Sequence, residues 1–253
     1  MKPSLSNGIF SEYSLAENIA AVKKLGFENL EFNMKCVEEE DEEAVYPAKK
    51  HINAYGLKCL TLHAATLPVK NKSEIAKAVY YGKVSADFAQ KFSAPVKVVH
   101  SNVSRKLPET LRRKFITKIF GEITPYANRL GLKLALENLS HSSKSFGENT
   151  AEIDEILSVI GGDVGITIDF CHAETTGQTL SLLEKYSNRL LNVHVSNKAH
   201  NPITAETLAL KIFLHKLQEY NYNGPLTIEL NRKCTTKQIL ETYAIIEKIL
   251  GRV

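Results

Sequence analysis

The stretch Gly165-Ile-Thr-Ile-Asp-Phe-Cys-His172 joins a short β-branched apolar run to a carboxylate and, three residues later, an imidazole. A run of this length and composition predicts a buried strand. Polar groups at the end of such a strand lie at the rim of the sheet, where loops begin. Three further apolar runs end in the same way, 132–137 in Glu137, 190–194 in His194 and 225–229 in Glu229. Four strand ends that carry Asp, Glu, His and Glu predict one shared site.

The composition is ordinary for a soluble globular protein, with 43% apolar and 24% charged residues. The net charge of +4, from 32 basic and 28 acidic residues, is too small to indicate nucleic acid as a partner. The sequence contains no run of about 18 apolar residues, so it predicts no membrane span. The first residues lack the apolar core of a signal peptide. Four scattered cysteines without a Cys-x-x-Cys pair are typical of a reducing compartment. We therefore expect a cytoplasmic protein with no membrane partner.

Apolar runs alternate with amphipathic stretches along the whole chain. The expected strands are 7–10, 27–32, 57–63, 95–100, 132–137, 165–172, 190–194 and 226–230. The expected helices are 14–25, a second that follows the acidic run 38–43 and ends near 55, and then 73–92, 109–130, 150–160, 179–188, 205–220 and 235–250. Ser14-Leu-Ala-Glu17 has the pattern of a capping box at the start of the first helix.

Strands that alternate with helices predict a parallel sheet. Eight such units in 253 residues predict an α/β protein with a closed (β/α)8 TIM barrel, in a single domain that spans residues 1–253. An open, doubly wound sheet is the alternative. That fold would need a glycine-rich loop after its first strand, where this chain reads Phe10-Ser-Glu-Tyr13.

In barrel enzymes the functional groups lie at the carboxyl ends of the strands. The ionisable residues expected there are Glu31, His63, His100, Glu137, Asp169, His172, His194 and Glu229. Neighbouring carboxylates repel one another and are costly to bury, and a divalent cation is the simplest compensation. A set of three carboxylates and one imidazole suits Mn, Mg, Co or Zn.

Each candidate also has a purely structural interpretation. His63 or His100 alone could be a hydrogen-bonded structural group, and Asp169 could cap the turn after its strand. Glu137 and Glu229 are harder to explain in this way, because a buried unpaired carboxylate is expensive.

Taken together, the motifs resemble those of the xylose-isomerase-like TIM-barrel superfamily, which contains sugar phosphate isomerases and epimerases and is related to endonuclease IV. The resemblance covers nearly the whole chain. It rests on Gly26-Phe-Glu-Asn-Leu-Glu31, Leu136-Glu-Asn138, Ile168-Asp-Phe-Cys-His172, Val193-His194 and Gly224-Pro-Leu-Thr-Ile-Glu229.

The resemblance implies that Glu137, Asp169, His194 and Glu229 hold one divalent metal. It also implies that Glu137 and Glu229 are catalytic residues on opposite sides of a sugar or sugar phosphate. The reaction would be isomerisation or epimerisation in carbohydrate metabolism, by proton transfer through a metal-bound cis-enediolate. The substrate-binding candidates are His63, His100, His172, Lys198 and His200. Assembly into a homo-oligomer stays open.

Two other functions stay open. An endonuclease IV-like zinc phosphodiesterase acting on abasic DNA would use most of the same residues. The chain departs from that pattern at Lys198, where an Asp is expected two residues before His200, and at 201–205, where a Gly-Glu-Gly segment is expected. It departs from the isomerase pattern at Asn197, where an Asp is frequent. A barrel that binds a sugar without turnover is the third class.

Overall fold

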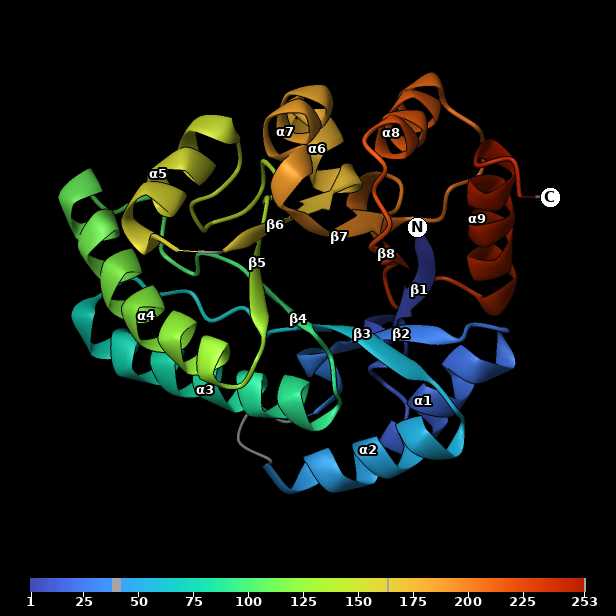
Figure 1. The fold of residues 1–253 in the computed structure, drawn as a ribbon, viewed down its shortest axis with the longest axis horizontal. Coiled ribbons are helices and arrows are strands. Elements are labelled where there is room, and N and C mark those ends of the chain that lie inside the picture. The colour runs from blue at the N-terminus through green and yellow to red at the C-terminus, as the bar shows by residue number, and fades with distance from the viewer. Residues whose placement is uncertain (38–41, 163, 253) are drawn as a thin grey trace.

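The strands form a closed parallel barrel with helices around it (Figure 1). The structure is a computed structural model that describes residues 1–37, 42–162 and 164–252. The strands follow one another around the ring in chain order, and the eighth returns to pair in parallel with the first. The predicted (β/α)8 barrel is therefore confirmed, and the open sheet is excluded.

The elements alternate as the sequence indicates. The strands are β1 (Lys2–Ser6), β2 (Asn29–Asn33), β3 (Lys58–His63), β4 (Val96–Val99), β5 (Lys133–Glu137), β6 (Gly165–Asp169), β7 (Leu190–Val195) and β8 (Pro225–Ile228). The helices are α1 (Leu15–Lys24), α2 (Val45–Ala54), α3 (Ile75–Lys91), α4 (Glu109–Arg129), α5 (Thr150–Ile160), α6 (Phe170–Thr176), α7 (Thr179–Tyr186), α8 (Leu208–Glu219) and α9 (Thr236–Ile249).

Local sequence signals place several of the helix ends. Ser14 caps α1 through the predicted capping box with Glu17, and Thr235 caps α9 in the same way with Gln238. In the acidic run, residues 38–41 lie outside the described residues. Among the described helices, none combines the length and the apolarity that crossing a membrane requires.

The first strand is not where the apolar pattern predicts it. Residues 7–10 form a short 3-10 helix, η1 (Asn7–Phe10), and β1 is the more polar segment Lys2–Ser6. Ile9 and Phe10 are buried, but they belong to η1, which follows the strand. Leu5 is the buried large apolar residue of β1, while Ser4 and Ser6 are buried with small polar side chains. The prediction of a strand at 7–10 is wrong. The apolar pattern does not detect the true first strand, because β1 contributes little apolar volume to the barrel.

The sixth strand is shorter than expected and runs directly into a helix. It ends at Asp169, whose Oδ1 accepts a hydrogen bond of 2.7 Å from the backbone N–H of His172 and so caps α6. At the other end of the strand, a Cβ on Gly165 would lie 2.4 Å from Leu191 Cδ1, so glycine permits the close approach of β7. His172 therefore projects from the first turn of a helix.

Polar side chains occupy much of the barrel interior. Thr61 Oγ1 donates a hydrogen bond of 2.8 Å to Glu31 Oε2, and Thr227 Oγ1 donates one of 3.3 Å to Asn192 Oδ1. These residues are fully buried and come from β2, β3, β7 and β8. Burial of such groups is tolerated when they bond to one another. The interior thus forms a polar platform beneath the carboxyl ends of the strands.

Lys97 in β4 is a buried lysine on the helix side of the barrel wall. It is fully buried, and its ammonium donates a hydrogen bond to the carbonyl of Gly82 in α3. Burial lowers the pKa of Lys97 to about 7, although the charge of Asp87 opposes that shift. Above about pH 7 the folded protein therefore holds this lysine mainly as the uncharged amine. In an unfolded chain, where the pKa of lysine is about 10.4, the uncharged form appears only at high pH.

Replacement of Lys97 by Met should stabilise the protein, most of all at low pH. The unfolded chain binds more protons than the folded one between about pH 7 and 10.4, so wild-type stability rises with pH across that window. At pH 6 we expect Lys97→Met to raise the free energy of unfolding by at least about 1.4 kcal/mol, the value of one pKa unit. Urea unfolding at pH 6, 8 and 10 measures this gain, which should shrink as the pH rises. Lys133→Met, an exposed lysine at the start of β5, is the control. A gain independent of pH would contradict the interpretation.

Candidate metal centre and active site

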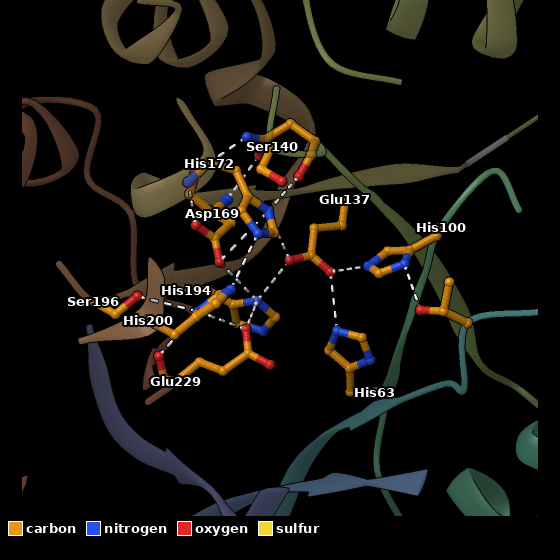
Figure 2. Close-up of polar contacts among 12 residues, drawn as sticks. His63, His100, Glu137, Ser140, Asp169, His172, His194, Ser196, His200 and Glu229 are labelled. Atoms are coloured by element: carbon orange, nitrogen blue, oxygen red, sulfur yellow. Dashed lines mark hydrogen bonds and ion pairs between the residues drawn. The ribbon is translucent and has the colours of Figure 1, made fainter. Parts of the chain in front are cut away.

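Three carboxylates converge on one ring nitrogen of His194 at the carboxyl ends of the strands (Figure 2). His194 Nδ1 lies 3.0 Å from Glu137 Oε1, 3.1 Å from Glu229 Oε2 and 3.8 Å from Asp169 Oδ2. The carboxylates belong to the ends of β5 and β6 and to the residue after β8, and His194 lies in β7. The structure thus brings together the four side chains that the sequence assigns to a metal.

The donor set suits a divalent cation. Asp169 uses Oδ1 to cap α6, while its Oδ2 is buried and has no hydrogen-bond partner among the described residues. A buried carboxylate oxygen without a partner is expensive unless a cation satisfies it. Ligand atoms of His63, Glu137, His194 and Glu229 also lie within 4.8 Å of one another, as do those of Asp169, His172 and His200. The described residues therefore contain clusters that can hold metal.

The charges in this cluster depend on one another. Burial disfavours the ionised forms of Glu137 and Glu229, but His194 holds the pKa of both carboxyls well below the ordinary value. Burial also opposes protonation of His194, yet Glu31, Glu229 and Glu137 raise its pKa well above the ordinary value. The protonated ring is thus the cation among the carboxylates. Because Nδ1 cannot keep its proton and also ligate a metal, the two are alternatives at this position.

Glu31 holds the opposite edge of the same ring. His194 Nε2 donates a hydrogen bond of 2.8 Å to Glu31 Oε2, which also accepts from Thr61 Oγ1 at 2.8 Å and from Asn192 Nδ2 at 3.3 Å. A partner on the second ring nitrogen fixes the orientation of an imidazole ligand. The sequence places Glu31 at the mouth with the other strand ends, but the structure places it below His194.

His63 and His100 both contact the other oxygen of Glu137. His63 Nε2 lies 3.0 Å and His100 Nε2 2.8 Å from Glu137 Oε2. Thr66 Oγ1 lies 2.9 Å from His100 Nδ1. Burial opposes protonation of His63, but Glu137 raises its pKa to about 9, whereas burial lowers the pKa of His100. One charged and one neutral imidazole therefore flank this carboxylate.

His172 and His200 form a second pair on the other side of the centre. Their Nε2 atoms are 3.2 Å apart. Burial opposes protonation of His172, but the charges of Asp169 and Glu137 favour it, and the pKa of His172 is raised. His200 lies in the short helix η6 (Lys198–His200), where Ala199 and His200 have φ values of 59° and 54°. Left-handed backbone is strained for residues other than glycine. The local backbone is thus held in a costly conformation that places His200 beside the cluster.

Two asparagines fix the loops around this pair. Asn138 Oδ1 accepts a hydrogen bond of 2.7 Å from the Asp169 N–H, and the Asn138 carbonyl lies 2.9 Å from His172 Nδ1. Asn231 donates its backbone N–H to the His200 carbonyl at 2.8 Å and its Nδ2 to the same carbonyl at 3.1 Å. Sequence reasoning assigned neither residue a role. Asn138 follows Glu137 directly and belongs to the motif Leu136-Glu-Asn138, which is the signal that pointed to it.

Lys198 is the candidate that lies apart from the cluster. It is exposed, and its ammonium makes no ion pair with the described residues. It lines a cavity of about 810 Å³ together with His172, His200 and the loop after β5. Lys198 thus lies within reach of a bound molecule, without contact to the carboxylates.

A (β/α)8 barrel with carboxylates and imidazoles clustered at its mouth is the class that this fold and site define. The chain belongs to the family described as the xylose isomerase-like TIM barrel, whose model matches residues 19–248.

Solved structures of similar fold cover nearly the whole chain. A D-tagatose 3-epimerase-like protein superposes with a TM-score of 0.84 at 21% identity, over 99% of this chain and 97% of that one. The 3-keto-D-glucoside 4-epimerase of E. coli gives a TM-score of 0.82 at 17% identity, over 98% and 99%. At such identities the likeness shows the fold.

Curated relatives are uncharacterized proteins of Methanocaldococcus jannaschii. MJ1311 is 29% identical over 152 residues, which are 55% of this chain and 51% of that protein, so the match spans about half of the relative's length. MJ1188 is 19% identical over 99% of this chain and 96% of that protein.

Replacement of His194 by Ala should abolish binding of a divalent metal, because it removes the nitrogen on which the carboxylates converge. For the wild type, Mn²⁺ at 100 times its dissociation constant should raise the free energy of unfolding by about 2.7 kcal/mol. Thermal unfolding with and without Mn²⁺, together with elemental analysis, measures both quantities. His51→Ala in α2 is the control and should keep the full shift. Metal content of His194→Ala equal to that of the wild type would refute the assignment.

Proposed function

We propose that the protein is a metal-dependent isomerase or epimerase of a sugar or sugar phosphate. The observation that carries this proposal is the pair of carboxylates on either side of His194 Nδ1, Glu137 at 3.0 Å and Glu229 at 3.1 Å. They come from β5 and from the end of β8, which are not neighbouring strands of the barrel. Two bases on different sides of a small substrate suit removal of a proton from one face and its return on the other.

The names of similar structures support the same chemistry. Besides the two structures above, a D-psicose 3-epimerase superposes with a TM-score of 0.80 at 15% identity, over 99% of this chain and all of that one. Each of these names describes epimerisation of a sugar or a keto-glycoside. We therefore propose a hydroxy-ketone or hydroxy-aldehyde sugar as the substrate class.

In this proposal Glu137, Asp169, His194 and Glu229 hold the metal, and Glu137 and Glu229 also move the proton. A divalent cation would supply the positive charge that acidifies the C–H next to the substrate carbonyl. Without metal, the charge of His194 holds the pKa of both glutamates well below the ordinary value, and a bound divalent cation would take over that role, so both would be carboxylates at neutral pH. Return of the proton to the same carbon gives epimerisation, and return to the adjacent carbon gives isomerisation.

The surrounding imidazoles have positions suited to the hydroxyl groups of a sugar. His63 and His100 both contact Glu137 Oε2 and so fix the orientation of its carboxylate. His172 and His200 line the cavity of about 810 Å³, where Lys198 also lies. We propose these five side chains as the substrate-binding set.

The cluster of Asp169, His172 and His200 is the observation that favours the second candidate, an endonuclease IV-like zinc phosphodiesterase. Together with His63, His100 and Glu137 it could hold further zinc ions. Elemental analysis of the purified protein separates the candidates, because one ion per chain supports the isomerase or epimerase and three support the nuclease. Nicking of abasic DNA would also support the nuclease. A barrel that binds sugar without turnover predicts neither proton exchange nor nicking.

Glu137→Gln and Glu229→Gln should each lower kcat by about 100- to 10,000-fold, the usual contribution of a general acid or base. An amide resembles the carboxylate in shape and can ligate weakly, but it cannot carry the proton. Incorporation of solvent deuterium into ketoses in the presence of Mn²⁺ measures the step. Glu122→Gln, on the exposed face of α4, is the matched control. Either site variant exchanging deuterium at nearly the wild-type rate would exclude that residue from the proton transfer.

A further inference from the structure

A second cavity opens directly beside Glu229, between the segments that follow β1, β2 and β8. Its volume is about 330 Å³, within the range of cavities that bind small ligands. Its lining includes Gly8, Asn33, Lys35, His200, Glu229 and Arg232. Of the three carboxylates around His194, the described lining includes Glu229, whereas the cavity of about 810 Å³ is lined by none of them. The smaller cavity is thus the one that reaches a proposed acid/base group.

Asn33 is a buried side chain in this wall with an unused donor. It is 1% exposed, and its Oδ1 accepts a hydrogen bond of 3.0 Å from the Lys35 N–H. Because a backbone N–H requires an acceptor, this bond identifies the oxygen of the amide, and Nδ2 is the opposite atom. Nδ2 is buried and has no hydrogen-bond partner among the described residues. A buried amide donor without a partner is costly.

The position of Asn33 is fixed by a network of amides. Asn7 Oδ1 accepts a hydrogen bond of 2.7 Å from the Asn33 N–H, and Asn7 Nδ2 donates to Asn18 Oδ1 at 2.8 Å. Asn18 in turn donates to the carbonyls of Asn7 and Phe10, at 3.1 and 2.9 Å. The network joins η1, α1 and the end of β2. The unused donor of Asn33 is therefore held by the fold itself.

Gly8 packs closely against this amide. A Cβ at position 8 would lie 3.1 Å from both Cγ and Nδ2 of Asn33, which is tighter than an ordinary contact. The φ of Gly8 is not in the left-handed region that favours glycine. Close packing of the backbone against the Asn33 side chain is thus the reason for glycine at this position.

The charges of the cavity are arranged by depth. The buried Glu229 lies at the inner end, while Lys35 is exposed and Arg232 has 62% of its side chain exposed. Arg232 pairs with Glu12 at 2.8 Å, but an exposed ion pair is worth little and can exchange its partner for a bound anion. A molecule that reaches Glu229 with one end would meet two cationic side chains with the other.

We propose that this cavity binds the far end of the substrate, and that this end carries an anionic group, a phosphate or a carboxylate. Lys35 and Arg232 bind the anion, and Asn33 Nδ2 donates a hydrogen bond to a hydroxyl or carbonyl oxygen along the sugar chain. The proposal rests on the proposed isomerase or epimerase function, whose substrate class it narrows to sugar phosphates or sugar acids. It assigns the anion to Lys35 and Arg232 in place of Lys198.

Calorimetric binding of matched ketoses to the purified full chain tests this assignment. The ligands are D-fructose, D-fructose 6-phosphate and the analogue in which the terminal CH₂OH is a carboxylate, with inorganic phosphate as a fourth probe. We expect at least one anionic ligand to bind ten times or more tightly than D-fructose. We expect Lys35→Met and Arg232→Met each to weaken anionic binding about tenfold and to leave D-fructose unchanged. Lys58→Met, an exposed lysine at the start of β3, is the matched control for loss of charge. The preferred anionic ligand distinguishes phosphate from carboxylate.

Asn33→Asp tests the donor separately, because it keeps the oxygen that accepts from Lys35 and removes the Nδ2 donor. It should weaken binding of D-fructose itself, while an unchanged unfolding temperature shows that the fold persists.

Three results would overturn the proposal: equal affinity for charged and uncharged ketoses, loss of the preference in Lys198→Met but not in Lys35→Met, or no binding of any probe. Tight anion binding that depends on Lys35, without deuterium exchange on any ketose, would instead support the subsite and refute the isomerase or epimerase function.

Discussion

The repulsion among carboxylates gathered around one imidazole is the constraint on which the rest of this site depends. Glu137, Asp169 and Glu229 are almost fully buried within 3.8 Å of His194 Nδ1. Like charges at such separations cannot all stay ionised without a cation among them. In this structure the protonated ring takes that role, with its pKa raised against the cost of burial. A divalent cation would take the same role with more charge and would also satisfy the unpartnered oxygen of Asp169.

The architecture follows from the need to hold these groups still. Parallel strands bring their carboxyl ends to one rim, and closure between β8 and β1 gives every strand two neighbours. The polar platform below, from Glu31 to Thr227, supplies the partner for His194 Nε2. The backbone around Ala199 and His200 adopts left-handed angles that Asn231 holds in place. This left-handed backbone costs stability but fixes the position of His200, and such strain is common at functional sites.

The alternation of apolar runs with amphipathic stretches predicted the barrel, and the polar residues at the strand ends predicted that Glu137, Asp169, His194 and Glu229 share one site. Both signals are local and repeat with every βα unit. The first strand was misplaced because Leu5 is the buried large apolar residue of this short segment, while the buried Ser4 and Ser6 carry no apolar signal. The cap that Asp169 forms on α6 was one of two readings left open. The roles of Glu31, Asn33 and Asn231 depend on contacts between segments far apart in the chain, which no local pattern encodes. Lys97 was unforeseen for the same reason, since its acceptor lies in α3.

We propose that one divalent cation is shared by the groups at the ends of β5, β6, β7 and β8. Anomalous diffraction at the manganese absorption edge, from crystals grown with Mn²⁺ near pH 7.5, tests it most directly. We predict a peak bounded by Glu137, Asp169, His194 and Glu229, with His194 Nδ1 as the nitrogen ligand. An ordered site without such a peak, with the His194 ring still bonded to the carboxylates, would contradict it.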